Sequence, residues 1–149
     1  MTEAPCPFCD HSAPERVAWS HPRCRVLLIE DSPFVGLCRV VWNAHVKELT
    51  DLGEADRAFV LRVVAAVEEG LRRLLAPDKM NLASFGNQVP HLHWHVIPRF
   101  ADDSHYPEAI WAPAVRAQPD RTLPPDFAAA LAAFLDERLR PVDRGSAIG

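Results

Sequence analysis

The sequence predicts a small α+β protein, because short segments with strand character flank one long segment with helical periodicity. Strand candidates cover residues 17–20, 23–29, 36–42, 80–85 and 91–97. The first three are short, apolar and separated by brief turns, which is typical of an antiparallel meander. Apolar residues recur at helical spacing over residues 52–75. Pro124-Pro125 opens a last helix near residues 124–140, and this order of elements predicts the α+β class.

The length of 149 residues fits a single domain, which we expect over residues 1–149. Residues 1–16 are expected to form a leader, and residues 101–149 a C-terminal extension that ends in a frayed tail over residues 142–149.

Charge and hydropathy exclude several classes of protein. The net charge is −4 with no basic block, which disfavours general nucleic-acid binding. No apolar run approaches the roughly 20 residues that span a bilayer, so we expect no membrane segment. The first residues lack the basic and apolar regions of a signal peptide, which predicts a cytoplasmic protein.

A C-x-x-C pair lies in the leader, in the motif Cys6-Pro7-Phe8-Cys9. This spacing is typical of a redox dithiol or of half a zinc site. A redox pair needs a strand before it and a helix after it, whereas only five residues precede Cys6 and a Pro-containing segment follows Cys9. Zinc is therefore the favoured interpretation, and two unused surface thiols are the alternative.

Three histidines alternate in the last strand candidate, His91-Leu92-His93-Trp94-His95-Val96. On a strand they would share one face, about 7 Å apart. Three imidazoles in register compete for protons and lose hydration, which disfavours a purely structural role. The cluster predicts metal ligands, general acids or bases, or a nucleophile.

The segment from Gly86 to Arg99, with its His-x-His-x-His core, resembles the signature of the histidine triad (HIT) superfamily. The resemblance covers about residues 4–100. It implies a HIT-like α+β fold with a five-stranded antiparallel sheet and one long helix, to which the helix predicted near residues 124–140 adds a C-terminal helix, and it implies a homodimer. It also implies nucleotide binding with hydrolysis or transfer of nucleotidyl groups.

The same resemblance implies roles for individual residues. The middle histidine, His93, would be the nucleophile that attacks the α-phosphorus, and His95 would donate a hydrogen bond to a phosphate oxygen. The other implied nucleotide contacts are Asn81 near phosphate and ribose, Asn87 and Gln88 in the phosphate loop, and Glu30 or Asp31 at the ribose.

Zinc-bearing branches of the superfamily, which include relatives of galactose-1-phosphate uridylyltransferase, imply a metal site here. Its ligands would be Cys6, Cys9, His45 and His91. Two thiolates and two imidazoles form a closed tetrahedral set, which implies structural zinc.

Leu37 stands where many family members have a histidine, and Asn87 stands where glutamine is common. The nucleophile position is intact, so the sequence favours a hydrolase of dinucleoside polyphosphates or nucleoside phosphoramidates. The missing histidine motivates one alternative, a nucleotide-binding regulator with little turnover. The zinc arrangement motivates another, a nucleotidyl transferase.

The segment Tyr106-Pro107-Glu108-Ala109-Ile110-Trp111 lies beyond the resemblance and carries two aromatic residues in a polar region. Large apolar groups in such a loop favour a contact. Three destinations remain open for them: the nucleotide pocket, a second subunit, or the chain's own core.

Overall fold

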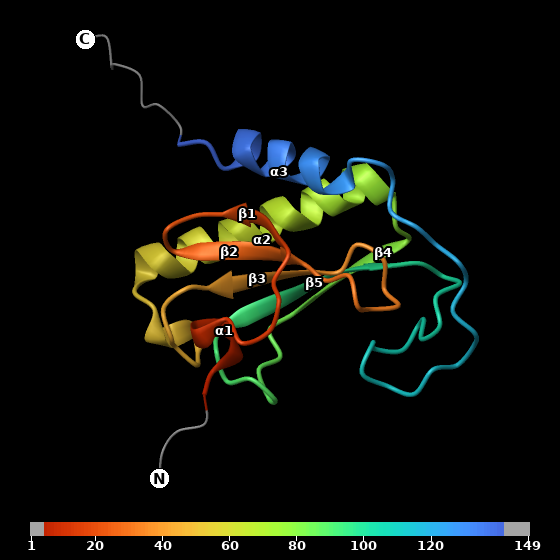
Figure 1. The fold of residues 1–149 in the computed structure, drawn as a ribbon, viewed down its shortest axis with the longest axis horizontal. Coiled ribbons are helices and arrows are strands. Elements are labelled where there is room, and N and C mark those ends of the chain that lie inside the picture. The colour runs from red at the N-terminus through yellow and green to blue at the C-terminus, as the bar shows by residue number, and fades with distance from the viewer. Residues whose placement is uncertain (1–4, 142–149) are drawn as a thin grey trace.

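The computed structural model describes residues 5–141 and has a five-stranded antiparallel sheet at its centre (Figure 1). The strands, in spatial order, are β1 (Val17–Ser20), β2 (Cys24–Leu28), β3 (Cys38–Trp42), β5 (His93–Arg99) and β4 (Lys79–Ala83). The predicted α+β class and antiparallel sheet are therefore confirmed. Residues 1–4 and the predicted tail over 142–149 lie outside the described residues, so the single-domain extent over 1–149 stays a prediction.

Two long helices cover one face of the sheet, and in Figure 1 the longer one runs behind the strands. They are α2 (Glu54–Leu75) and α3 (Phe127–Arg138), close to the predicted spans of 52–75 and 124–140. Gly70 lets them approach each other, because a Cβ there would lie 2.9 Å from side-chain atoms of Leu131 and Phe134. Among residues 5–141, no helix combines the length and apolarity needed to cross a membrane.

Two short helices complete the described chain, α1 (Pro7–Asp10) and the 3₁₀ helix η1 (Leu49–Asp51). Helix α1 includes Pro7, Phe8 and Cys9 of the C-x-x-C motif, in a segment that we expected only to form a leader. It lies on the side of the sheet away from α2 (Figure 1). Its residue Phe8 is buried with Leu27 and Val41. The leader therefore covers part of the second face.

The side chains of the strands alternate between the two faces of the sheet. Val40, Trp94 and Val96 belong to the main core beneath α2. Their neighbours Arg39, His93 and His95 consequently lie on the opposite face. This second face, which we call the histidine face, is defined by Arg25, Arg39, Asn81, His93, His95 and Arg99.

The predicted last strand over residues 91–97 is shifted, since β5 begins at His93. Pro90 has no amide hydrogen, and the amide of His91 turns back to the carbonyl of Val89 at 2.8 Å. His91 thus precedes the strand, so strand alternation does not position its ring, although Phe8 of the leader contacts the rings of both His91 and His93. His93 and His95 do share a face.

The far end of β5 is fixed by a buried ion pair. Arg99 donates to both carboxylate oxygens of Asp103, at 2.8 and 3.1 Å, and both side chains are almost fully buried. A further guanidinium nitrogen donates to the carbonyl of Glu108 at 2.7 Å. These contacts tie the segment after β5 to the sheet, on the histidine face.

Candidate functional site

His93 is held in one orientation by a backbone contact. Its Nδ1 lies 2.6 Å from the carbonyl oxygen of His91, which places the ring proton on Nδ1. Nε2 then keeps its lone pair, and no residue within 5–141 hydrogen-bonds it. Burial lowers the pKa of His93, and Arg39 and His91 lower it further, although the His91 carbonyl partly offsets them. His93 is therefore a neutral imidazole with an available nitrogen at neutral pH.

His95 lies beside His93, with ring centroids 4.9 Å apart and an interplanar angle of 71°. Burial, His93 and Arg39 lower the pKa of His95 to about 4. Its Nδ1 is buried and has no hydrogen-bond partner among the described residues. A neutral histidine with one nitrogen unsatisfied is suited to contact a ligand.

Trp111 covers the outer side of His95. The two rings are 5.0 Å apart and nearly perpendicular, and Trp111 stacks on Phe85 at 4.7 Å. Trp111 is 47% exposed, so it does not pack in the chain's own core. Of the three destinations open to this segment, the described chain places Trp111 at the histidines. A small cavity there is lined by Phe8, Arg39, Phe85, Gln88, Val89, His93, His95 and Trp111.

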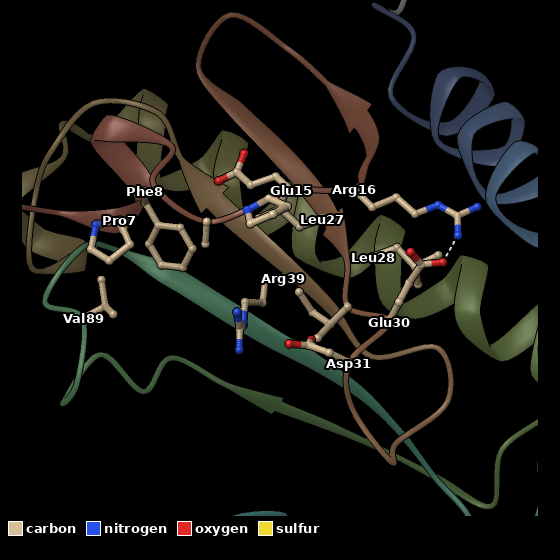
Figure 2. A pocket seen from close by; sticks show the side chains of 13 residues that line it. Pro7, Phe8, Glu15, Arg16, Leu27, Leu28, Glu30, Asp31, Arg39 and Val89 are labelled. Atoms are coloured by element: carbon tan, nitrogen blue, oxygen red, sulfur yellow. Dashed lines mark hydrogen bonds and ion pairs between the residues drawn. The ribbon is translucent and has the colours of Figure 1, made fainter.

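A larger cavity of about 670 Å³ adjoins it, between the leader and strands β2 and β3 (Figure 2). Its volume lies within the roughly 300–1,000 Å³ of small-molecule sites. The apolar lining includes Phe8, Leu27, Ile29 and Val89. Phe8, Arg39 and Val89 line both cavities, so the two meet at these side chains.

Both candidate acids at the ribose line the large cavity, but they point in different directions. Glu30 forms an ion pair with Arg16 at the rim, whereas the carboxylate of Asp31 points toward Arg39 (Figure 2). The electrostatic effect of Asp31 on Arg39 agrees with that direction. Asp31 is thus the acid directed at the junction of the two cavities.

The three predicted polar contacts are only partly brought together. Gln88 lines the small cavity beside His93 and His95. Asn87 lines an adjacent hollow with His91 and His93. Asn81 pairs with Ile97 across the strands, and its Oδ1 accepts a hydrogen bond from Arg99 at 2.8 Å. Asn81 therefore lies on the histidine face, and its Oδ1 is engaged by Arg99.

The four predicted metal ligands converge beside α1, with one ligand atom from each of Cys6, Cys9, His45 and His91 inside a 4.8 Å span. Nδ1 of His91 lies 3.3 Å from Sγ of Cys6 and 3.2 Å from Nδ1 of His45. Tetrahedral zinc, with Zn–S of about 2.3 Å and Zn–N of about 2.0 Å, separates its ligand atoms by about 3.4–3.8 Å. The donor set and the spacing fit zinc.

A second contact prepares His91 as a ligand. Its Nε2 hydrogen-bonds the carbonyl oxygen of Trp42, which places the ring proton on Nε2 and leaves Nδ1 directed at the thiols. Phe8 lies between the metal-ligand cluster and the histidine face, with its ring centroid 5.6 Å from that of His91 and 5.0 Å from that of His93. The metal-ligand cluster and the histidine face are thus neighbours with separate members.

Arg39 was not among the predicted site residues, although its position in the sequence carried a signal. Arg39 is the single charged residue in the apolar run from Leu37 to Trp42, and alternation from the buried Val40 places it on the opposite face. In the sheet it pairs with His95. Phe85 and Phe8 were also missed, since only the folded chain brings them to the histidines.

Comparisons with known proteins agree with this geometry. The family model described as HIT domain matches residues 11–102. A histidine triad protein from Bradyrhizobium japonicum is 29% identical, with a TM-score of 0.67 over 78% of this chain and 87% of that one. One from Marinobacter aquaeolei is 27% identical, with a TM-score of 0.69 over 83% and 90% of the two chains.

A Zn-bound histidine triad family protein from Mycobacterium smegmatis shares the fold at 24% identity, with a TM-score of 0.60 over 89% of this chain and 94% of that one. The search of curated proteins found no match. The HIT-domain match spans more than half of the chain and includes the histidine signature, so this chain belongs to the HIT family.

Proposed function

We propose that this HIT protein is a nucleotide-binding hydrolase that cleaves nucleoside phosphate derivatives through a nucleotidyl-His93 intermediate. One observation carries the proposal. The hydrogen bond from His93 to the His91 carbonyl leaves Nε2 as the free nitrogen, next to a cavity of suitable size for a nucleoside. A positioned, neutral imidazole is the form of histidine that attacks phosphorus.

The large cavity supports a particular orientation of the nucleotide. Its apolar wall, which includes Leu27 and Ile29, suits the faces of a base. Asp31 is the acid we assign to the ribose hydroxyls, because the carboxylate of Glu30 is engaged with Arg16. The 5′ end of the nucleotide then lies toward His93 and His95, where Asn87 and Gln88 flank the phosphate.

The chemistry divides into two displacements. In the first, Nε2 of His93 forms a bond to the α-phosphorus as the bond to the leaving group breaks. In the second, water attacks the same phosphorus and releases His93 and the nucleoside monophosphate. His95 is neutral and donates one N–H to a phosphate oxygen as negative charge develops in each step.

One observation favours a second candidate, a nucleotide-binding regulator with little turnover. Leu37 is 3% exposed and packs with Phe34 and Ile97. At this position many family members have a histidine, and an aliphatic side chain supplies no proton to a leaving group. The two candidates therefore differ in turnover, not in nucleotide binding.

Measuring the turnover of two substrates distinguishes the hydrolase from the regulator. The wild type is incubated with a diadenosine polyphosphate and with a fluorogenic adenosine phosphoramidate, and products are measured by chromatography and fluorescence. The hydrolase predicts product from at least one, loss of activity in His93→Ala, and retained activity in His21→Ala. His21 is a matched control because it packs on Phe59 of α2. Tight nucleotide binding without product from either substrate would favour the regulator.

We also propose that the Cys6, Cys9, His45 and His91 cluster binds one structural zinc ion. A bound zinc would fasten α1, and with it Phe8, to the start of β5, and it would supply no open coordination position for chemistry. The neighbour from M. smegmatis is described as Zn-bound, which is consistent with the assignment.

Elemental analysis of protein purified without a histidine tag tests the metal. We expect about one zinc per chain, loss of it in Cys9→Ser, and retention in Cys24→Ala, which alters a thiol in the main core. Zinc-free protein of undiminished stability would show that Cys6 and Cys9 are exposed thiols only. The homodimer and the cytoplasmic location stay predictions.

A further inference from the structure

Arg39 is a half-buried cation, and no other residue within 5–141 forms a hydrogen bond or ion pair with its guanidinium group. Its Nε is buried, and no described residue accepts a hydrogen bond from it. Asp31 is the one acid that acts on it electrostatically, and no hydrogen bond joins the two side chains. Figure 2 shows the guanidinium extending from β3 into the large cavity.

An unpartnered guanidinium at this depth is costly to the folded chain. Burial lowers the pKa of Arg39, which is a sign that the folded chain holds the charged form at some expense, and Asp31 offsets this in part. Buried charges in folded proteins are normally paired and hydrogen-bonded. Because no described residue accepts a hydrogen bond from Nε of Arg39, we infer that the acceptor for this guanidinium group is a bound ligand.

The position of Arg39 defines what that ligand carries. Arg39 pairs with His95 in the sheet and lines both cavities, so it lies between the nucleoside cavity and the two histidines. If a nucleotide has its base in the large cavity and its α-phosphorus at His93, its phosphate lies next to Arg39. A planar guanidinium matches two phosphate oxygens at once.

We propose that Arg39 is a phosphate-binding residue that contacts the non-bridging oxygens of the nucleotide's α-phosphate. This inference rests on the proposed nucleotide function. Arg39 keeps its proton throughout and transfers none. Its charge compensates the negative charge on the phosphate while His95 contributes one neutral N–H, so the site binds nucleotides in preference to nucleosides.

The test measures how binding depends on the ligand's phosphate. Calorimetry gives dissociation constants for adenosine 5′-monophosphate and adenosine, and for the guanosine pair, with wild type, Arg39→Met, Arg39→Lys and Arg72→Met. Arg72 is a matched control on α2, with 67% of its side chain exposed. In Arg39→Met the preference for monophosphate over nucleoside falls about tenfold or more, while nucleoside binding changes less than twofold.

Arg39→Lys keeps part of the preference because the charge remains, and Arg72→Met keeps all of it. A structural role for Arg39 predicts a different pattern, in which Arg39→Met weakens monophosphate and nucleoside equally or lowers the melting temperature.

Failure of the phosphate-binding role of Arg39 and failure of the proposed nucleotide function give different results in this experiment. If wild type and a stably folded Arg39→Met prefer the monophosphate to the same degree, the phosphate-binding role is overturned and the proposed nucleotide function stands. If wild type binds neither ligand pair, the proposed function is overturned, and this inference with it.

Discussion

The arginines at the edges of the histidine face and the arginine at its centre differ in their hydrogen bonding. At its edges, all three guanidinium nitrogens of Arg25 and of Arg99 donate hydrogen bonds. Arg25 donates to both carboxylate oxygens of Glu15, and Arg99 does the same to Asp103. At the centre, Arg39 has no hydrogen-bond partner among residues 5–141.

The contrast separates two uses of the same side chain. The edge arginines hold peripheral segments against the sheet: Arg25 secures the leader through Glu15 and the carbonyl of Phe8, and Arg99 secures the extension. Arg39 holds no segment in place. Pairing at the edges thus contributes to the fold, whereas the unpaired centre is available to a ligand.

The largest expected effect is the loss of an edge arginine. Arg99→Met leaves Asp103 buried without its counter-ion, which costs about 3–5 kcal/mol of unfolding free energy. Urea denaturation followed by circular dichroism measures it. Arg39→Met serves as the comparison and should change stability by less than about 1 kcal/mol, or increase it, because no partner is orphaned. Equal losses in the two variants would abolish the distinction between edge and centre.

Low pH should reduce the stability that the Arg99–Asp103 ion pair contributes at the edge of the histidine face. Burial alone would raise the pKa of Asp103, but hydrogen bonds from Arg99 and from the amides of His105 and Tyr106 lower it to about 2. The unfolded chain has a value near 3.9. A group with a depressed folded pKa stabilises above the unfolded pKa, so this contribution of about 2 kcal/mol is present above roughly pH 4 and disappears toward pH 2.

Denaturation between pH 5 and pH 2 checks the acid effect. Asp103→Asn should flatten the fall in stability over that window. Asp102→Asn is the matched control, since the side chain of Asp102 is 63% exposed and should leave the profile unchanged. The assignment fails if the two variants give the same profile.

Trp111 has the smallest expected effect, and it concerns the centre. Its ring contacts His95 and Phe85 and is largely accessible, so Trp111→Ala should leave stability nearly unchanged. Loss of an aromatic contact at the site should raise KM about two- to tenfold. Trp111→Phe keeps a ring and should retain most of the activity. Unchanged kinetics with a shift toward monomer in sedimentation would instead assign Trp111 to a subunit interface.

The sequence predicted the regular elements well, because strand and helix periodicity are local signals. The strand over 17–20 matches β1, and the helix over 52–75 matches α2 within two residues. The ends of other elements moved by up to three residues, as with β5, where a turn at His91 delays the strand. The antiparallel meander of the first three strands was also predicted and is confirmed, whereas the pairing of β3 with β5 joins distant segments and could not be predicted from these patterns.

The site was predictable where a motif is contiguous and unpredictable where distant segments meet. His93 and His95 belong to one short signature, the C-x-x-C spacing identified Cys6 and Cys9, and the resemblance supplied His45 and His91 as the remaining candidate ligands. The capture of Asn81 by Arg99 depends on tertiary contacts from another strand. Strand alternation could have placed Arg39 on the face of His93 and His95. That its Nε has no hydrogen-bond partner among the described residues, however, can be seen only in the folded structure.

The central claim is that His93 forms a covalent bond to the nucleotide, and intact-mass spectrometry during turnover tests it most directly. The enzyme is mixed with a diadenosine polyphosphate and quenched within milliseconds to seconds in alkaline denaturant, because an N–P bond is labile in acid. We predict a transient species heavier by one adenylyl group in the wild type and in Arg72→Met, and none in His93→Ala. Steady product release with no adduct in the wild type, together with turnover by His93→Ala, would contradict the account.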